Sequence, residues 1–302
     1  MKNIAVVTVN YNTAKDTQAF LASLAKINRV NFTIQTIVVD NGSTEKFQLS
    51  PQEQLHTTLI YNADNIGFSG GYNIGIKTAL ENGANAVMIV NNDTLLDPNI
   101  LIHLEKVLYS EDVIGLTVPK MYFAKGHEFH KDRYTKEQVG KVLWYAGGSV
   151  DWNNVQSIHR GVDEVDDGQY NRTEKVDFAS GCCMLIKKEV FEKVGMFDER
   201  YFLYYEDADL CERMKRAGYM LYYVPRAFLY HVNASSSGGA GNVIQDYYIT
   251  RNQMLFGMSY APLRAKIALL RQSSRLLQQG RPKQKKAIKD YFLRRFGKGE
   301  NL

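Results

Sequence analysis

An acidic turn follows an apolar segment in the first half of the chain. Residues 86–90 read Ala-Val-Met-Ile-Val, and Asn91, Asn92 and Asp93 come directly after them. A short apolar run bounded by turn formers is typical of a buried strand in a parallel sheet. Open α/β sheets bind ligands at the carboxyl ends of such strands. An acid at that position can hold a divalent cation, and the cation can hold a diphosphate. The alternative is that Asn-Asn-Asp is only a turn.

A second group of acids follows the aromatic residues of segment 201–205. On a helix predicted over residues 206–217, Glu206 and Asp209 share a face and Asp207 points elsewhere. Carboxylates beside aromatic rings suit a sugar hydroxyl, because the rings pack on the sugar face and a carboxylate can act as a general base. The alternative is that acids at a helix start stabilise the helix dipole.

Other polar residues indicate a nucleotide site. Asp40 ends a predicted strand, where it can accept hydrogen bonds from a nucleobase or a ribose, and Tyr11 can stack on a base. The turn over residues 67–71 would let the backbone approach a ligand and would open a helix whose N-terminus favours phosphate. Its spacing matches neither a dinucleotide-binding nor a Walker motif, so NAD-binding and ATP-hydrolase folds are disfavoured. A tight turn of small residues is the alternative.

A lone histidine, His231, follows the last predicted strand, and a serine cluster comes after it at residues 235–237. As a neutral imidazole, His231 is a candidate metal ligand. A structural histidine is the alternative.

Strands and helices alternate in the first half of the chain, which predicts a parallel sheet built from βαβ units. The predicted strands there are 4–9, 33–39, 58–61 and 86–90. The second half is less regular, with loops expected at 123–138 and 151–174. Further predicted elements are a strand at 113–118, a strand at 176–186, a helix at 188–194 closed by Gly195, and a strand at 219–224 ended by Pro225.

The basic residues are concentrated near the end of the chain. Segment 264–298 has twelve Lys or Arg and one acid, Asp290. The whole chain of 302 residues has 37 basic and 32 acidic residues, which leaves 25 against 31 elsewhere. Because the body is acidic and has no recognition motif, a nucleic-acid partner is disfavoured.

The same segment has an apolar stripe at helical spacing. Arginines at 264, 271 and 275 lie mostly around this stripe, which consists of Leu263, Ile267, Leu270, Ser274 and Leu277. A basic amphipathic helix is typical of binding to an anionic membrane surface. The alternative is an ordinary helix that packs its stripe on the core.

No apolar stretch is long enough for a transmembrane helix, and the first residues read as a strand rather than a signal peptide. The three cysteines lack metal-ligand spacing and are expected to be reduced core thiols of a cytosolic protein.

A set of motifs in order resembles the family 2 glycosyltransferases, in the branch that includes bacterial rhamnosyltransferases. The resemblance covers roughly residues 4–252 and rests on VTVNYN, VVDNGS, NIGFSGGYNIGI, VNNDT, FASGCCMLI and GMFDERYFLYYEDADLCERMKRAGY followed by His231. It implies the α/β GT-A fold, with a Rossmann-like nucleotide-binding sheet that becomes mixed. The implied division is a catalytic domain at 1–255, with a nucleotide-sugar half (about 1–120) and an acceptor half (about 121–255), and a basic helical tail at 256–302.

The resemblance also implies roles for individual residues. Asp207 would be the catalytic base. The family's Asp-x-Asp metal motif falls on residues 91–93, where the first position is Asn, so Asp93 would bind Mg²⁺ or Mn²⁺ with His231 as second ligand. Residues against the nucleotide or lining the donor pocket would be Asn10, Tyr11, Asp40, Asn65, Gly67, Gly71, Asn73 and Asn92. Acceptor-binding residues would be Tyr205, Glu206 and Asp209.

The implied activity is an inverting transfer of a sugar from dTDP-rhamnose or a UDP-hexose to a cell-surface polysaccharide or lipid-linked glycan. The enzyme would work in the cytoplasm or peripherally on the inner face of the plasma membrane. One rival is a nucleotidyltransferase. A Gly-rich basic loop after the first strand would favour this rival, but residues 10–13 there read Asn-Tyr-Asn-Thr. The other is a non-catalytic nucleotide-sugar-binding protein, against which Asp93, Asp207 and His231 argue.

Overall fold

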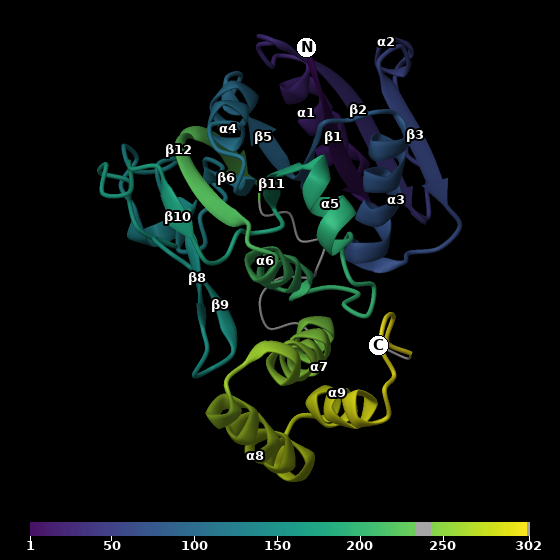
Figure 1. The fold of residues 1–302 in the computed structure, drawn as a ribbon, viewed down its shortest axis with the longest axis vertical. Coiled ribbons are helices and arrows are strands. Elements are labelled where there is room, and N and C mark those ends of the chain that lie inside the picture. The colour runs from purple at the N-terminus through teal and green to yellow at the C-terminus, as the bar shows by residue number, and fades with distance from the viewer. Residues whose placement is uncertain (233–242, 301–302) are drawn as a thin grey trace.

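A computed structural model describes residues 1–232 and 243–300 (Figure 1). Its centre is a mixed sheet in the order β10-β12-β6-β11-β4-β1-β2-β3, with β5 beside β12 and β7 beside β6. A separate hairpin pairs β8 with β9. The strands are β1 (Lys2–Asn10), β2 (Phe32–Asn41), β3 (Thr57–Asn62), β4 (Ala86–Val90), β5 (Thr94–Leu96), β6 (Ile114–Phe123), β7 (Leu143–Tyr145), β8 (Gly148–Asp151), β9 (Gln156–His159), β10 (Glu174–Val176), β11 (Cys183–Lys187) and β12 (Met220–His231).

The predicted parallel half is confirmed. β1 pairs in parallel with both β2 and β4, and β3 pairs in parallel with β2. β11 then pairs antiparallel with β4 and with β6, which makes the whole sheet mixed. All five residues of β4 are buried, as its unbroken apolar sequence predicts for a central strand.

The helices are α1 (Ala14–Leu24), α2 (Pro51–Gln54), α3 (Gly67–Glu81), α4 (Ile100–Leu108), α5 (Lys188–Val194), α6 (Glu206–Arg216), α7 (Val243–Tyr260), α8 (Leu263–Gln279) and α9 (Pro282–Phe292), with a 3₁₀ turn η1 (Lys131–Arg133). Helix α5 ends at Gly195, whose φ of +78° is accessible to glycine. Helix α6 carries acids in its first turn and basic residues in its last, which complements the helix dipole.

The turn expected at residues 67–71 before a helix is already part of that helix. It forms the first turns of α3, and its glycines face protein rather than open space. A Cβ at Gly71 would lie 3.2 Å from Cγ1 of Val9, and one at Gly75 would lie 2.3 Å from Cγ1 of Val7. These glycines let α3 pack directly on β1 and β2.

Two strand predictions and one loop prediction in the second half were wrong. The strand expected at 176–186 is two strands, β10 and β11, separated by residues 177–182. β12 does not end at Pro225; the ladder with β6 is irregular between Val224 and Phe228, which accommodates a residue without an N–H, and then continues to His231. Segment 151–174 contains the second strand of the β8–β9 hairpin, although segment 123–138 is a loop apart from η1, as predicted.

The N-terminus and the helices α8 and α9 lie at opposite ends of the molecule (Figure 1). β1 begins at the N-terminal end and β2, β3 and β4 run parallel to it, so their carboxyl ends point toward the C-terminal helices. Helix α7 is continuous through the predicted boundary at 255/256, so the helical tail begins with α8. Among the described helices, none has the length and hydropathy needed to cross a bilayer.

Candidate active site

The pairing of two strands brings Asp93 and His231 together. β5 and β12 pair antiparallel with His231 opposite Thr94, and the backbone N–H of Val232 donates to the carbonyl of Asp93 at 2.8 Å. Nε2 of His231 lies 3.2 Å from Oδ1 of Asp93. Both side chains are buried, so a carboxylate and an imidazole share a small polar site at the carboxyl end of β4.

This pair fits a nucleotide-bound divalent cation. Nδ1 of His231 is buried and has no hydrogen-bond partner among the residues that the structure describes, and its ring meets Trp144 edge-on at 4.6 Å. In the described ranges 1–232 and 243–300, no cluster of three His, Cys, Asp or Glu residues could hold a metal alone. Mg²⁺ is commonly held by one or two protein groups together with substrate phosphates, and two ligands suit that arrangement.

Asp207 lies in the first turn of α6 and is half-buried. Its Oδ2 accepts a hydrogen bond from the N–H of Gly181 at 3.0 Å, and its Oδ1 accepts one from the N–H of Ala208 at 2.8 Å. Burial raises the pKa of this carboxyl, and the two backbone donors oppose that rise. A Cβ at Gly181 would lie 3.3 Å from the Asp207 Cβ, so glycine allows this close approach.

The segment containing Gly181 connects Asp207 to the end of β4. The next residue, Cys182, accepts a hydrogen bond at its carbonyl from the N–H of Asn91 at 2.9 Å. Cys183 then begins β11, opposite Val90 of β4. Gly181, whose N–H binds Asp207, is therefore only two residues before β11. β11 pairs with β4, and Asp93 lies in the turn that follows β4.

Glu206 and Asp209, predicted to bind acceptor, are both buried in the protein. Burial, followed by the neighbouring Asp207 charge, raises the pKa of Glu206 well above its ordinary value, which favours the neutral form of this carboxyl. Asp209 accepts hydrogen bonds from Nε of Arg213 at 2.8 Å and from the hydroxyl of Tyr260 at 2.7 Å. An acceptor-binding role for Asp209 would require these contacts to break.

Tyr205 precedes α6 in a left-handed conformation, with φ of +75°. Its hydroxyl donates to the carbonyl of Val155 at 2.8 Å. The preceding residue, Tyr204, also has a positive φ, of +69°. The backbone therefore turns sharply just before α6, in a left-handed conformation that residues other than glycine rarely adopt.

The polar residues at the ends of β1 and β2 bond to one another. Nδ2 of Asn10 donates to Oδ2 of Asp40 at 2.8 Å and to Oγ of Ser43 at 3.0 Å. Asp40 also accepts from the backbone N–H groups of Ser43 and Phe47. Both Asn10 and Asp40 are buried, so they shape the loop after β2, whereas Tyr11 beside them is 39% exposed and accessible to a ligand.

Asn92 also bonds within the protein. Its Nδ2 donates at 2.7 Å to the hydroxyls of both Thr13 and Thr17 at the start of α1. Thr17 in turn donates to Oδ1 of Asn10 at 2.8 Å. Hydrogen bonds to the start of α1 thus link the end of β1 with the turn that follows β4.

Asn65 and Asn73 fix the start of α3 and its contact with the segment before α6. Oδ1 of Asn65 accepts from the N–H of Gly67 at 2.8 Å, at the start of the helix. The side chain of Asn73 exchanges two hydrogen bonds with the backbone of Phe197. A Cβ at Gly67 would lie 2.3 Å from the carbonyl oxygen of Phe202, so the start of α3 and the segment before α6 lie in direct contact.

Sequence reasoning assigned no role to two residues of α7 that hold that segment. Nδ2 of Asn252 donates to the carbonyls of Leu203 and Tyr204 at 2.9 and 2.8 Å. Arg251 is fully buried, and its Nη2 donates to the carbonyl of Arg200 at 3.2 Å. The adjacent Arg and Asn in the sequence were the only signal.

Asp16 on α1 was missed entirely; burial, followed by the Asp93 carboxylate, raises its pKa.

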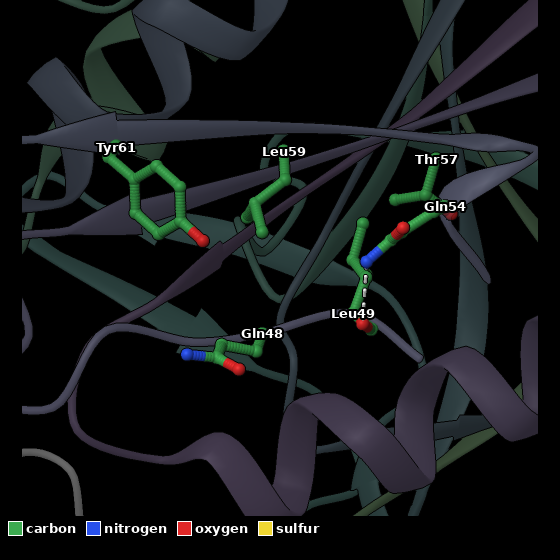
Figure 2. A pocket seen from close by; sticks show the side chains of 6 residues that line it. All are labelled: Gln48, Leu49, Gln54, Thr57, Leu59 and Tyr61. Carbon is green, nitrogen blue, oxygen red and sulfur yellow. Dashed lines mark hydrogen bonds between the residues drawn. The ribbon is translucent and has the colours of Figure 1, made fainter. Parts of the chain in front are cut away.

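Two hollows of the surface lie away from these residues. Figure 2 shows one of about 340 Å³ beside β3, lined by Gln48, Leu49, Gln54, Thr57, Leu59 and Tyr61. Another, of about 560 Å³, lies at the N-terminal end and is lined by Met1, Lys2, Asn31 and Asn85. None of the predicted site residues lines either hollow. The serine cluster at 235–237 falls outside the described residues.

Comparison with known proteins gives a consistent result. The model of the family described as glycosyltransferase like family 2 matches residues 2–245. The chain is 26% identical over 244 residues to an N-acetylglucosaminyl-diphospho-decaprenol L-rhamnosyltransferase of Mycobacterium tuberculosis, with 78% of each chain covered. It is 26% identical over 273 residues to the dTDP-rhamnosyl transferase RfbF of Shigella flexneri, covering 86% of this chain and 82% of that one.

The fold is likewise similar to that of a solved enzyme. GalNAc-T7, in a crystal structure with UDP, GalNAc and Mn²⁺, superposes with a TM-score of 0.69 at 16% identity. The match covers 96% of this chain and 55% of GalNAc-T7, so the chain spans about half of that protein. The expected GT-A fold with C-terminal helices is confirmed.

Proposed function

The chain belongs to the glycosyltransferase like family 2 and is a glycosyltransferase, and we propose that it transfers rhamnose from dTDP-rhamnose to a lipid-linked or polysaccharide acceptor. The two relatives whose names specify rhamnosyl transfer support this donor, and the decaprenol-linked substrate named for one of them supports a lipid-linked acceptor. UDP-hexoses are the alternative donors. In this proposal residues 1–120 form the donor half and residues 121–255 the acceptor half.

In the proposed reaction Asp207 is the general base. It removes the proton from an acceptor hydroxyl as that oxygen bonds to the anomeric carbon of the sugar. The bond between the anomeric carbon and the diphosphate breaks in the same step, so the configuration inverts and no covalent enzyme intermediate forms. The proton remains on the Asp207 carboxylate until solvent removes it. The base therefore has to be ionised before each turnover.

Asp93 and His231 would hold the divalent cation, Mg²⁺ or Mn²⁺. A bound cation supplies neutralisation of the charge that develops on the diphosphate leaving group. The Mn²⁺ in the GalNAc-T7 structure is in keeping with this assignment. Tyr11, exposed beside the buried Asn10–Asp40 pair, is the residue we propose to stack on the nucleobase.

The single observation that carries the proposal is the placement of Asp207. A carboxylate oriented by two backbone N–H groups is connected, through the Gly181–Cys182 segment, to the end of β4, and Asp93 lies in the turn that follows this strand. The base thus comes from helix α6, and the two cation ligands come from the turn after β4 and from the end of β12. The three cysteines are buried free thiols, which fits action in the reducing cytoplasm.

The test is a donor screen followed by substitution. The protein is incubated with Mn²⁺ or Mg²⁺ and each nucleoside diphosphate sugar, and release of nucleoside diphosphate is measured without and with a synthetic lipid-diphosphate sugar acceptor. We expect release from dTDP-rhamnose. Asp93→Asn should abolish it, whereas Asp207→Asn should keep donor binding and lower transfer by about 10²–10⁴-fold.

Asp167→Asn is the matched control, because Asp167 is an exposed aspartate and is distant in sequence from both Asp93 and Asp207. It should leave the rate unchanged. Donor binding is followed separately by thermal shift, so a variant that fails to fold is recognised. Failure of every nucleoside diphosphate sugar to bind the wild type would refute the proposed function.

A further inference from the structure

The tail helix α8 buries one stripe and exposes another. Ala265, Leu269 and Ser273 are buried against the rest of the protein. The side chains of the predicted amphipathic stripe instead face outward, with Leu263, Ile267, Leu270 and Leu277 respectively 73%, 43%, 40% and 36% exposed. We call these four residues the α8 outer stripe. The alternative that this stripe packs on the core is therefore wrong.

Cations border the α8 outer stripe. Arg264, Arg271 and Arg275 are exposed, and their spacing of seven and four residues places them along one side of the helix, next to the stripe. The single acid between residues 264 and 298, Asp290, is buried and bonded to Nζ of Lys286 at 2.6 Å. The exposed surface of this segment is therefore cationic and apolar, with no exposed carboxylate.

We propose that the α8 outer stripe inserts into the headgroup region of an anionic phospholipid bilayer, with the bordering arginines bound to lipid phosphates. An apolar helical face flanked by cations matches such an interface, because apolar side chains enter the acyl boundary while cations bind the headgroups. A second copy of the chain fits less well, since a symmetric contact would bring the same cations together. Nucleic acid would leave the four apolar side chains without a partner.

If the protein acts on a lipid-linked acceptor, as proposed above, the orientation of the tail gives this surface a use. The carboxyl ends of the parallel strands, where Asp93 lies, point toward the end of the molecule that carries α8 (Figure 1). Docking through α8 would turn the catalytic edge toward the bilayer, where a lipid-linked acceptor is held.

The experiment measures vesicle binding without donor or acceptor. The full chain is floated with vesicles of phosphatidylcholine alone and with vesicles that also contain phosphatidylglycerol. We expect binding to the anionic vesicles only. In the variant Ile267→Gln with Leu270→Gln, the partition coefficient should fall by about tenfold or more, because two apolar side chains are lost from the interface. Arg271→Gln with Arg275→Gln should also weaken binding.

Two matched controls fix the interpretation. Leu55→Gln changes a leucine that is 77% exposed far from the tail, and Arg226→Gln changes an exposed arginine of β12; both should bind like the wild type. Absence of binding to anionic vesicles overturns the proposal. So does binding that survives the α8 outer stripe substitutions, or a change from dimer to monomer caused by them in sedimentation. Because no substrate is present, either result is independent of the transferase test.

Discussion

The carboxyl of Asp207 is under two opposing influences. Burial favours its neutral form, while the N–H groups of Gly181 and Ala208 favour the carboxylate. The net effect raises the pKa, which makes this group a stronger base than an exposed aspartate while the two donors keep it oriented. Glu206 beside it is in the opposite situation, with a buried Oε2 that has no hydrogen-bond partner within the described residues. Two backbone donors favour the ionised form of Asp207, and within the described residues no donor reaches Oε2 of Glu206.

This difference predicts a pH-dependent stability effect. The pKa of folded Glu206 lies well above its ordinary value of 4.5, so between these values the unfolded chain releases a proton that the folded protein keeps. Stability contributed at this position is therefore present at low pH and falls as pH rises, by up to about 1.4 kcal/mol per pH unit. Because glutamine cannot ionise, Glu206→Gln should gain stability relative to the wild type on going from about pH 5 to about pH 8.

Urea unfolding of both proteins at the two pH values measures this gain. Glu45→Gln is the control, because Glu45 is exposed and its substitution removes no buried carboxyl. A Glu206→Gln difference that stays constant across the pH range would show that the carboxyl is ionised in the folded protein.

At the level of secondary structure, helix α3 owes its position to glycine. Gly75 lies against β1, and a Cβ there would lie 2.3 Å from Cγ1 of Val7. Intrinsic helix propensity alone predicts that Gly75→Ala stabilises the protein by up to about 1 kcal/mol. Overpacking predicts the opposite sign, with a loss of roughly 1–3 kcal/mol. We expect the packing effect to win, because Val7 is fully buried and has no space to move.

A double-mutant cycle tests this directly. Val7→Ala removes the clashing methyl, so the variant with both substitutions should be more stable than the sum of the two single effects, by roughly 0.5–3 kcal/mol. Free energies of unfolding from urea titrations supply all four corners. Additive effects, or a stabilising Gly75→Ala, would mean that α3 is not in such close contact with β1.

The same helix shows what the sequence could and could not predict. The parallel strands followed from their apolar runs, since burial on both faces leaves a signal within the strand itself. The glycines of α3 were assigned to a ligand loop because their true neighbours, Val7 and Val9, are more than sixty residues away in sequence. The site was predictable to a similar extent: Asp93 and His231 do lie together, but the hydrogen bonds of Asp40 with Asn10 and of Asp209 with Tyr260 depend on residues from other elements.

At the scale of the whole molecule, one buried cation contacts both the end of the tail and the segment before α6. Nη1 of Arg251 donates to the carbonyl of Gly297 at 2.8 Å, and Nη2 donates to that of Arg200 at 3.2 Å. The guanidinium is also flanked by the rings of Tyr247 and Tyr248, 5.3 and 5.1 Å from their centroids. The end of the tail and the segment that leads into Asp207 are therefore held by the same side chain. A bilayer bound at α8 would act on a tail that is fixed relative to the base.

Substitution of this arginine should loosen both segments together. Arg251→Met keeps an apolar stem but leaves the carbonyls of Arg200 and Gly297 without their charged donor, which should cost about 3 kcal/mol or more. Amide hydrogen exchange should then increase in residues 200–205 and also in 293–300. Arg251→Lys should not restore protection, because an ammonium cannot reach several carbonyls with the geometry of the guanidinium fork.

The control is Arg226→Met, which removes an exposed arginine and should leave exchange in both segments unchanged. Increased exchange in the tail alone would mean that Arg251 anchors α9 without acting on the segment before α6. Increased exchange in both segments would establish a mechanical link. Because Arg251 would then hold the tail in a fixed position relative to Asp207, a surface bound by the tail would also set the orientation of Asp207. That result would give a physical reason for a cationic tail on an otherwise acidic enzyme.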